Sequence, residues 1–165
     1  MLFIFDLDGT LIESFLYDWH DKENKPKEHP YDRVVVLPNR KERLQTLAKH
    51  HNQFAIITNQ GGVAFGYNTV EEVTTKLSVV VREFDFFYNC PFSVHVCYEH
   101  PKGTIPEYTK DSKDRKPKPG MLFKAMVRHG HTTSNTIYIG DLETDKQAAE
   151  AANMTYVDAE EFFRA

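Results

Sequence analysis

The chain has 165 residues, of which 41% are hydrophobic and 27% are charged, and its formal net charge is −4 at pH 7. These values are typical of a single globular domain, and they exclude the disordered, membrane-spanning and secreted disulfide-scaffold classes. The two cysteines, Cys90 and Cys97, favour a reducing compartment, so we expect a cytoplasmic protein with neither a signal peptide nor a membrane span.

Short apolar runs alternate along the chain with segments of helical periodicity. The first half predicts a strand over 2–5, a helix over 39–51, a strand over 54–57, a helix from Asn68 or Thr69 to Phe84, and a strand over 93–97. The second half predicts a helix from Pro119 to Gly130, a strand over 136–139, a helix through 148–152, a strand over 155–157 and a terminal helical turn. Alternation of this kind predicts parallel βαβ units with helices on both faces. We therefore predict an α/β fold with a Rossmann-like, doubly wound parallel sheet in a single domain over 1–165.

Two long segments interrupt this alternation. The first, about 14–38, is rich in charge, proline and aromatic residues, and its strand-like piece is 34–37. We interpret it as a short flap inserted after the first strand, because long loops in compact domains tend to be functional. Asn39 follows it and is expected to cap the first helix. The second segment, roughly 98–118, is basic and contains proline.

Polar residues follow the predicted strands at the points where these strands end. They are Asp6 and Asp8 after the first strand, Thr58 and Asn59 after the second, and Asp141 after the fourth. The basic residues Arg115, Lys116 and Lys118 precede the third helix. Because ligands bind at the carboxyl ends of parallel strands, we expect all of these side chains to converge on one edge of the sheet.

The carboxylates among them predict a metal site. Asp6 and Asp8 are two residues apart, so on a continuing strand both could point to one side, where Asp141 would join them. Three carboxylates repel one another unless a cation lies between them, and oxygen ligands favour Mg²⁺. A magnesium ion beside basic side chains, a threonine hydroxyl and a glycine-rich backbone suits a phosphate dianion. A carboxylate that is not needed for charge balance can attack phosphorus, so the pattern predicts a phosphoryl-transfer site.

Four segments of the chain resemble, in order, the signatures of the haloacid dehalogenase-like (HAD-like) phosphatases. They are FDLDGT at 5–10, TN at 58–59, Lys116 within RKPKPG, and GDLETD at 140–145, and they span nearly the whole chain. The resemblance implies a Rossmann-like core, here without a large cap domain. It also implies an enzyme that works through an aspartyl-phosphate.

The resemblance assigns catalytic roles to individual residues. Asp6 is implied as the nucleophile, and Asp8 as the general acid and base. Thr58 is implied to bind the phosphoryl oxygens, and Lys116 to neutralise their charge, although the basic loop leaves Lys118 as an alternative for this lysine.

The resemblance also implies ligands for metal and substrate. Mg²⁺ is assigned to the Asp6 carboxylate, the Asp8 backbone carbonyl and Asp141. Asp145 is either a partner of these ligands or a residue that caps or salt-bridges its own helix. Substrate contacts are assigned to Asn59, Gly61 and Arg115.

The resemblance extends to a branch of the family. TNQGGVAFG, YEHPKGTIPEY and RKPKPGML resemble segments of the histidinol-phosphate and heptose-bisphosphate phosphatases, and the polynucleotide 3′-phosphatases share TNQ and an RKP motif. The bacterial sugar-phosphate relatives carry a zinc loop, whose positions here are Cys97, Glu99, Ser112 and Asp114. With one thiolate among these four positions, we do not expect a zinc site.

We therefore predict a Mg²⁺-dependent phosphomonoester hydrolase whose substrate is a small sugar or metabolite phosphate. The main alternative is a nucleic-acid 3′-end phosphatase, against which the negative net charge argues weakly. A phosphotransferase and a non-catalytic binding module on the same fold are further alternatives. No membrane partner is expected.

Overall fold

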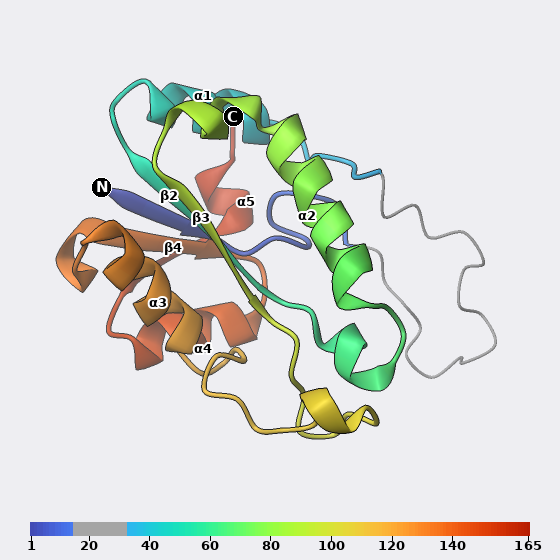
Figure 1. The fold of residues 1–165 in the computed structure, drawn as a ribbon. Helices are drawn as coiled ribbons and strands as arrows, with labels where there is room; N and C mark the ends of the chain where they lie inside the picture. The colour runs from blue at the N-terminus through green and yellow to red at the C-terminus, as the bar shows by residue number, and fades with distance from the viewer. Residues whose placement is uncertain (15–32) are drawn as a thin grey trace.

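Five parallel strands form the sheet at the centre of the computed structural model, which describes residues 1–14 and 33–165 (Figure 1). The strands are β1 (Leu2–Phe5), β2 (Gln53–Asn59), β3 (Phe92–Cys97), β4 (Thr136–Gly140) and β5 (Thr155–Asp158). Their order in the sheet is β3-β2-β1-β4-β5. All the neighbouring strands pair in parallel, which confirms the predicted α/β fold class.

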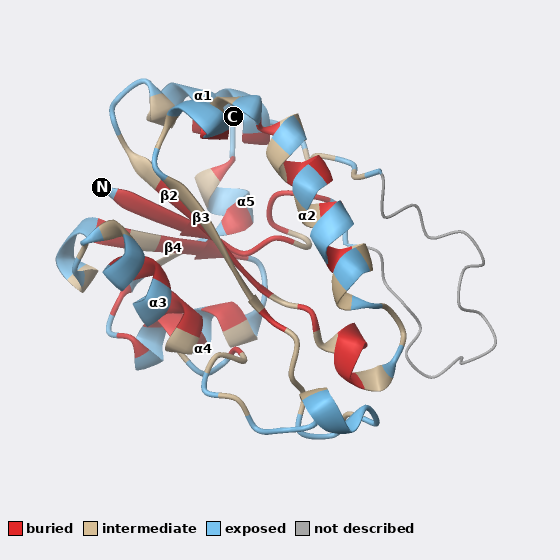
Figure 2. Cartoon of the chain, viewed as in Figure 1, coloured by how far each residue is buried: buried red, intermediate tan, exposed pale blue. Residues whose placement is uncertain are grey.

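Helices cover both faces of this sheet. They are α1 (Arg40–Ala48), α2 (Val70–Glu83), α3 (Gly120–His129), α4 (Glu143–Ala151) and α5 (Ala159–Phe162). Leu2 and Ile4 of β1 pack into a core with α3 and α4, whereas Phe3 and Phe5 point to the opposite face and pack with α1, α2 and α5. Figure 2 shows the central strands and the inward-facing turns of the helices as buried. This alternation along β1 is what a strand buried on both faces requires.

The helix boundaries follow the local signals closely at two places. The Thr69 hydroxyl accepts the backbone N–H of Glu72 at 3.1 Å and caps α2. Helix α3 ends at Gly130, whose φ of 67° lies in the left-handed region that glycine adopts without strain.

The prediction for Asn39 is wrong. Asn39 precedes α1, but its φ is 66°, and its side chain makes no capping bond. Its amide instead donates to the carbonyl of Phe163 at 3.2 Å, so a contact with the other end of the chain replaces the local cap. Helix α1 also ends at Ala48 rather than near residue 51, and α4 begins at Glu143, earlier than the predicted 148–152 segment.

The expected flap over about 14–38 lies mostly outside the described residues. Its two ends are described, and they lie side by side. Ile12 and Val36 form an isolated antiparallel bridge, which replaces the predicted strand-like piece over 34–37. The N–H of Glu13 donates to Val35 at 2.8 Å, and the N–H of Leu37 donates to Leu11 at 3.0 Å.

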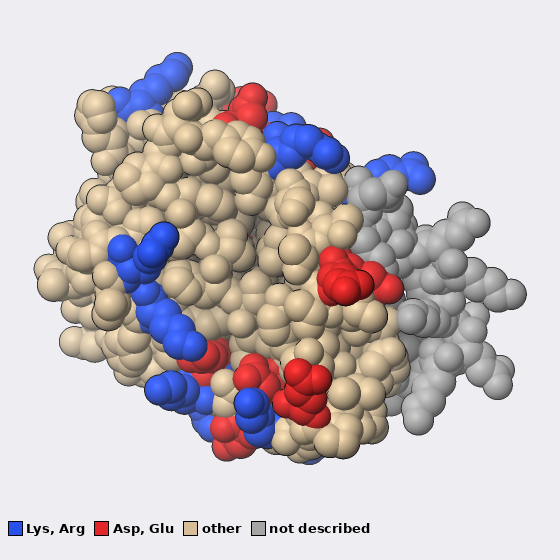
Figure 3. Space-filling view, in the orientation of Figure 1, with Lys and Arg blue, Asp and Glu red and all other residues tan. Residues whose placement is uncertain are grey.

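Charged side chains are mixed on the surface rather than separated by sign. On the face shown in Figure 3, lysine and arginine side chains lie beside aspartate and glutamate side chains along the lower edge. None of the described helices combines the length and the apolar character that a bilayer crossing requires.

Candidate active site

Asp6 lies directly after β1, at the carboxyl edge of the sheet. Its backbone N–H donates to the carbonyl of Ile139 in β4 at 2.9 Å, which extends the pairing one residue beyond the strand. The residue is 5% exposed. Its carboxylate accepts hydrogen bonds from Lys116 Nζ at 2.6 Å and from the Thr10 hydroxyl at 3.3 Å. Asp6 is therefore held mainly by the charged donor Lys116, with the Thr10 hydroxyl as a second, neutral neighbour.

The turn after Asp6 brings a second carboxylate close. Gly9 has a φ of 84°, and a β-carbon built on it would lie 2.2 Å from Asp141 Oδ2. Glycine is therefore required both for the backbone conformation and for the approach of Asp141. The Thr10 hydroxyl lies 3.1 Å from Asp141 Oδ1 and 3.3 Å from Asp6 Oδ2. Because a hydroxyl has one hydrogen, it can donate to only one of these carboxylates at a time.

Lys116 is the basic residue that reaches this group. It is 5% exposed, and its ammonium donates to Asp6 and Asp145, both at 2.6 Å, and to the Tyr138 hydroxyl at 3.3 Å. Lys118, the alternative in the sequence, points to the surface, where it pairs with Asp111 at 2.6 Å. The geometry therefore favours Lys116 as the lysine of the site.

Asp145 contacts both the lysine of the site and the start of its own helix. Its Oδ1 accepts from Lys116 and from the Tyr138 hydroxyl, each at 2.6 Å. Its Oδ2 accepts the backbone N–H groups of Asp141 and Leu142, at 3.2 and 3.0 Å, at the start of α4. The carboxylate thus caps its own helix and orients Lys116 at the same time. Since each oxygen already has two donors, Asp145 holds its neighbours in place rather than offering a vacant ligand atom.

The carboxylate group fits a divalent cation. Ligand atoms of Asp6, Asp141 and Asp145 all lie within 4.8 Å of one another. Among the described residues, Lys116 supplies the one ammonium that contacts this group, which leaves an excess of two negative charges when all three carboxylates are ionised. Oxygen donors with that excess charge suit Mg²⁺, and Asp6 and Asp141 have the less occupied oxygens.

The sequence predicts a cluster of Asp6, Asp8 and Asp141, and the prediction is wrong for Asp8. The Asp8 carboxylate is not part of the group within 4.8 Å, and Asp145 takes its place there. The two-residue spacing would align Asp6 and Asp8 on a continuing strand, but β1 ends at Phe5 and the chain turns at Gly9. The proposed role of the Asp8 backbone carbonyl as a ligand stays a prediction.

The pKa values of the group follow from its burial and its charge excess. Burial raises the pKa of Asp6 to about 8, with Lys116 opposing the rise and Asp145 adding to it. Burial also raises the pKa of Asp141. Although burial alone would raise it, the pKa of Asp145 is lowered by Lys116. The pair of Lys116 and Asp145 is therefore charged, and Asp6 is the carboxyl that retains a proton most readily without a metal.

Asp8 faces the other side of the site. Its Oδ1 accepts from Lys76 Nζ at 2.6 Å, and its Oδ2 accepts from Gln60 Nε2 at 2.9 Å. Gln60 also donates to the hydroxyl oxygen of Thr58 at 2.7 Å. Because that hydroxyl oxygen accepts from Gln60, the hydrogen of Thr58 is available to a ligand.

Asn59 holds the loop that carries the lysine. Its side-chain amide donates to the backbone carbonyl of Lys116 at 3.2 Å, and its Oδ1 accepts the backbone N–H of the same residue at 3.1 Å. This reciprocal pair joins the end of β2 to the basic loop. Asn59 therefore positions Lys116 in addition to facing the pocket.

Gly61 and Arg115 lie together at the mouth of the site. A β-carbon on Gly61 would lie 2.8 Å from Arg115 Nη1, so glycine leaves space for the guanidinium. Aromatic side chains border the same region: the Phe65 ring lies 5.6 Å from that of Tyr67 and 4.9 Å from that of His100, measured between centroids. All three are partly exposed.

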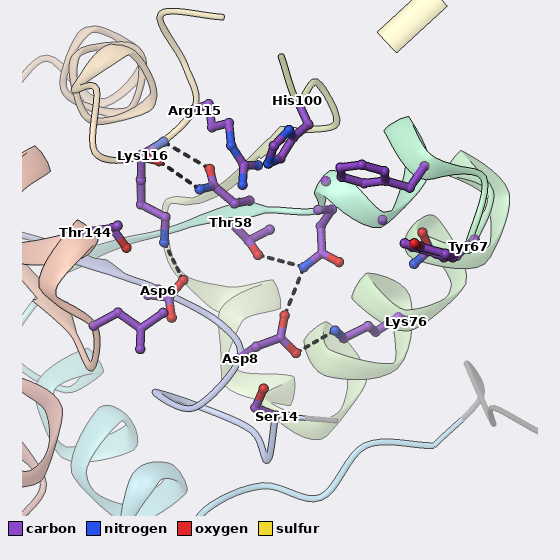
Figure 4. Close-up of a pocket in the computed structure, with 17 residues that line it drawn as sticks. Asp6, Asp8, Ser14, Thr58, Tyr67, Lys76, His100, Arg115, Lys116 and Thr144 are labelled. Carbon is purple, nitrogen blue, oxygen red and sulfur yellow. Dashed lines mark hydrogen bonds and ion pairs between the residues drawn. The ribbon is translucent and has the colours of Figure 1, made fainter. Parts of the chain in front are cut away.

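A pocket of about 530 Å³ joins these groups (Figure 4). The residues predicted as catalytic or substrate-binding all line it, namely Asp6, Asp8, Thr58, Asn59, Gly61, Arg115 and Lys116. Asp141 does not line this pocket and is linked to it through Thr10 and Asp6. The arrangement brings a buried carboxylate, a lysine, a hydroxyl and a second carboxylate to one cavity, which suits acyl- or phosphoryl-transfer chemistry.

Sequence reasoning missed several residues of the site. Lys76 gave a usable signal, because it lies between Val73 and Val80 on the apolar stripe of the predicted helix, where a lysine is out of place. Gln60 lies within TNQ but was assigned no role. Tyr138 gave no signal, since an aromatic residue in a buried strand is usual in a core.

Comparison with known proteins places the chain among phosphatases. The profile of the family described as polynucleotide kinase 3 phosphatase matches residues 1–163. A D-glycero-beta-D-manno-heptose-1,7-bisphosphate 7-phosphatase of Mesorhizobium japonicum is 28% identical over 154 residues, covering 90% of this chain and 64% of that protein. A D-glycero-alpha-D-manno-heptose-1,7-bisphosphate 7-phosphatase of Photorhabdus laumondii is 29% identical over 102 residues, covering 62% of this chain and 56% of that protein. The chain thus spans less than two thirds of the length of these relatives.

Solved structures show the same fold. A HAD-like phosphatase from Mesorhizobium loti superposes with a TM-score of 0.74 at 25% identity, over 92% of this chain and 68% of that one. A D,D-heptose 1,7-bisphosphate phosphatase from B. bronchiseptica, complexed with magnesium and phosphate, has a TM-score of 0.73 at 21% identity, over 94% of this chain and 78% of that one.

Proposed function

The chain belongs to the polynucleotide kinase 3 phosphatase family, within the HAD-like phosphatases, and we propose that it hydrolyses phosphate monoesters with Mg²⁺ through an aspartyl-phosphate on Asp6. The observation that carries this proposal is the buried Asp6 carboxylate, held 2.6 Å from Lys116 on the wall of a pocket. A carboxylate in this setting has a cation ready for the charge of an incoming phosphoryl group.

The proposed metal site combines Asp6 with Asp8 and Asp141. Asp6 and Asp141 would supply carboxylate oxygens to the ion, and the backbone carbonyl of Asp8 would be the third protein ligand. When bound, Mg²⁺ neutralises phosphoryl oxygens and makes the phosphorus more open to attack. The excess negative charge around Lys116 and the oxygen-only donor set support this assignment.

In the first step, an Asp6 oxygen forms a bond to phosphorus, and the bond between phosphorus and the leaving-group oxygen breaks. For this step Asp8 must carry a proton, which it gives to that oxygen, so that the product leaves as an alcohol. The Lys116 ammonium and the free hydrogen of the Thr58 hydroxyl face the phosphoryl oxygens. In the second step, water attacks phosphorus, Asp8 takes its proton, and the bond from phosphorus to Asp6 breaks.

We propose a small sugar or metabolite phosphate as the substrate. The heptose-bisphosphate phosphatases among the relatives support this choice. The pocket of about 530 Å³ also has the size of small-molecule sites. Arg115 at its mouth would contact an anionic or hydroxyl group of the substrate beyond the phosphate that reacts.

A second candidate substrate is the 3′-phosphorylated end of a nucleic acid. The family profile favours it, and so do the partly exposed rings of Phe65, Tyr67 and His100 at the pocket mouth, because bases stack on aromatic side chains. Acidic side chains interleave with the basic ones on the face in Figure 3, which disfavours a long strand-binding groove there.

The test is phosphate release with Mg²⁺ from one panel of sugar phosphates, histidinol phosphate, nucleotides and a 3′-phosphorylated oligonucleotide. We expect Mg²⁺-dependent release from a small phosphate, its loss in EDTA, and no turnover in Asp6→Asn with an unchanged circular dichroism spectrum. Preference for the oligonucleotide would replace the first substrate with the second. Substantial turnover by Asp6→Asn would remove Asp6 as the nucleophile, and the absence of release from every substrate would leave a binding module.

A further inference from the structure

Lys76 is a lysine on the buried face of helix α2. It shares that face with Val73 and Val80, which are both fully buried, and it is itself 9% exposed. An apolar residue would suit this position better, since burial of an ammonium is costly unless it is paired. The side chain of Lys76 instead leaves the apolar face and lines the wall of the pocket (Figure 4).

The partner of Lys76 is the residue proposed to transfer protons. Its ammonium donates to Asp8 Oδ1 at 2.6 Å, across 68 positions of sequence. The other oxygen of Asp8 accepts from Gln60 at 2.9 Å. Asp8 lies beyond the end of β1, where its backbone forms an isolated bridge with Ile12, so these two side-chain contacts set the direction of its carboxylate.

Stability does not explain this ion pair. The desolvation of a largely buried pair commonly offsets its Coulombic gain, and replacement by apolar groups is often neutral or stabilising. The side chains of Lys76 and Asp8 are 11% and 26% exposed. A costly lysine that reaches into the pocket and contacts a reactive group is better explained by a role in the reaction.

We propose that Lys76 is a positioning residue that holds Asp8 for proton transfer to the leaving group and from water. This inference rests on the proposed function, since it concerns the acid and base of that reaction. When Asp8 gives its proton to the leaving oxygen it becomes a carboxylate, and Lys76 with Gln60 keeps that carboxylate facing the reaction centre for the second step. Misplacement of a proton donor by about an ångström reduces the rate of a step that needs it by about a hundredfold.

The proposal predicts a dependence on the leaving group. An alkyl phosphate needs a proton on its leaving oxygen, whereas p-nitrophenyl phosphate releases a phenolate that needs none. For Lys76→Met we expect kcat/KM for the best alkyl phosphate of the panel to fall by about tenfold to a hundredfold. For p-nitrophenyl phosphate we expect kcat/KM to stay within about threefold. Lys76→Arg should recover part of the alkyl phosphatase activity, because it restores a cation at Asp8.

Lys41→Met is the matched control. Lys41 forms an ion pair of the same length, 2.6 Å, with Glu83, but both groups are exposed and lie outside the pocket. We expect both substrates to be hydrolysed at the wild-type rate by this variant. Urea unfolding and circular dichroism establish whether each variant is folded. If Lys76→Met does not fold, Lys76→Gln replaces it in the same assays.

Three results would overturn the inference. Equal losses for both substrates would show a structural role for Lys76. Unchanged kcat/KM for both would show no role. A rise in KM confined to substrates with a second phosphate would show that Lys76 binds that group instead of positioning Asp8. Failure of the proposed function is distinguishable, because wild-type protein would then show no Mg²⁺-dependent hydrolysis of any ester.

Discussion

Lys116 is the residue on which the candidate site most depends. Its ammonium lies between Asp6 and Asp145, at 2.6 Å from each, and is almost completely buried. Burial in this position makes the lysine a fixed cation rather than a flexible one, so its charge is already in place when a phosphoryl group arrives. The same geometry leaves two buried carboxylates dependent on one ammonium.

We expect Lys116→Met to reduce phosphatase activity by about a hundredfold or more. The free energy of unfolding should fall by about 3 kcal/mol, because the substitution leaves buried carboxylates without their cation. Lys118→Met is the control, since Lys118 is exposed and pairs with Asp111 on the surface. Steady-state kinetics and urea unfolding measure both effects. A larger loss of activity in Lys118→Met would exchange the roles of the two lysines.

A second residue-scale prediction concerns pH. Burial raises the pKa of Asp6 from 3.8 to about 8, against the opposing effect of Lys116. The folded protein then keeps a proton that the unfolded chain loses, so the stability due to this group falls as pH rises from about 4 to about 8. Asparagine does not titrate, so the Asp6→Asn protein does not lose stability in this way as pH rises. Without metal, the stability of Asp6→Asn relative to wild type should therefore increase with pH.

Urea unfolding in EDTA at pH 5 and pH 8 measures this change. We expect the difference in unfolding free energy between Asp6→Asn and wild type to grow by more than about 1 kcal/mol between the two conditions. A comparison of two proteins at each pH cancels the titration of groups that they share. A difference that is the same at both pH values would contradict the raised pKa.

The sequence was sufficient to predict which residues lie at the ends of the strands. It was sufficient to predict only some of the contacts that their side chains make. Asp6 and Thr58 converge as expected because the carboxyl ends of parallel strands meet at one edge, and Lys116 reaches Asp6 from the loop before α3. The direction of Asp8 was not predictable, because it depends on a turn at Gly9 and on Lys76 from a distant helix. The apolar stripe of the predicted helix marks Lys76 as out of place, but it does not show that Asp8 is its partner.

At the scale of elements, Arg40 joins three parts of the fold. It is the first residue of α1 and is 4% exposed. Its Nε donates to the carbonyl of Thr10, in the turn beside Asp6, at 2.9 Å. Its Nη2 pairs with Glu160 of α5 at 3.3 Å, and its guanidinium lies 4.4 Å from the centre of the Phe163 ring. Helices α1 and α5 thereby support the turn that carries the site.

We expect Arg40→Met to lower the free energy of unfolding by about 1 to 3 kcal/mol, because the buried carbonyl of Thr10 loses its donor. The affinity for Mg²⁺ should also fall, since the turn at Thr10 loses its support. Arg43→Met is the control: Arg43 also lies over an aromatic ring, Phe162, at 5.2 Å, but it is exposed. Urea unfolding and Mg²⁺ titration measure both changes, and equal effects in the two variants would contradict the anchoring role.

The order and type of the major elements followed from the sequence, whereas some boundaries did not. Helix α2 begins where Thr69 caps it, and α3 ends at Gly130, because both signals are local. Asn39 failed as a cap because its side chain bonds to Phe163, 124 positions away. A tertiary contact there outweighs the local preference of asparagine.

At the scale of the molecule, Asp6 and Asp141 come from neighbouring strands that are far apart in sequence. A cation shared by both would join the two halves of the sheet only in the folded state, so it should stabilise the protein. At a Mg²⁺ concentration a hundred times the dissociation constant, the free energy of unfolding increases by about 2.7 kcal/mol. We expect Mg²⁺ to raise the melting temperature relative to EDTA, and Asp141→Asn to abolish the rise. An equal rise in that variant would place the ion elsewhere.

The bridge between Ile12 and Val36 has a consequence for how this enzyme family can diversify. The two described segments meet at this bridge, where the N–H of Glu13 also donates to Val35 and the N–H of Leu37 to Leu11. The entropic cost of closing a loop grows only slowly with its length, so evolution can lengthen, shorten or exchange what lies between these anchors at little cost to the core. A segment exchanged between relatives at this junction would therefore leave the catalytic groups in place.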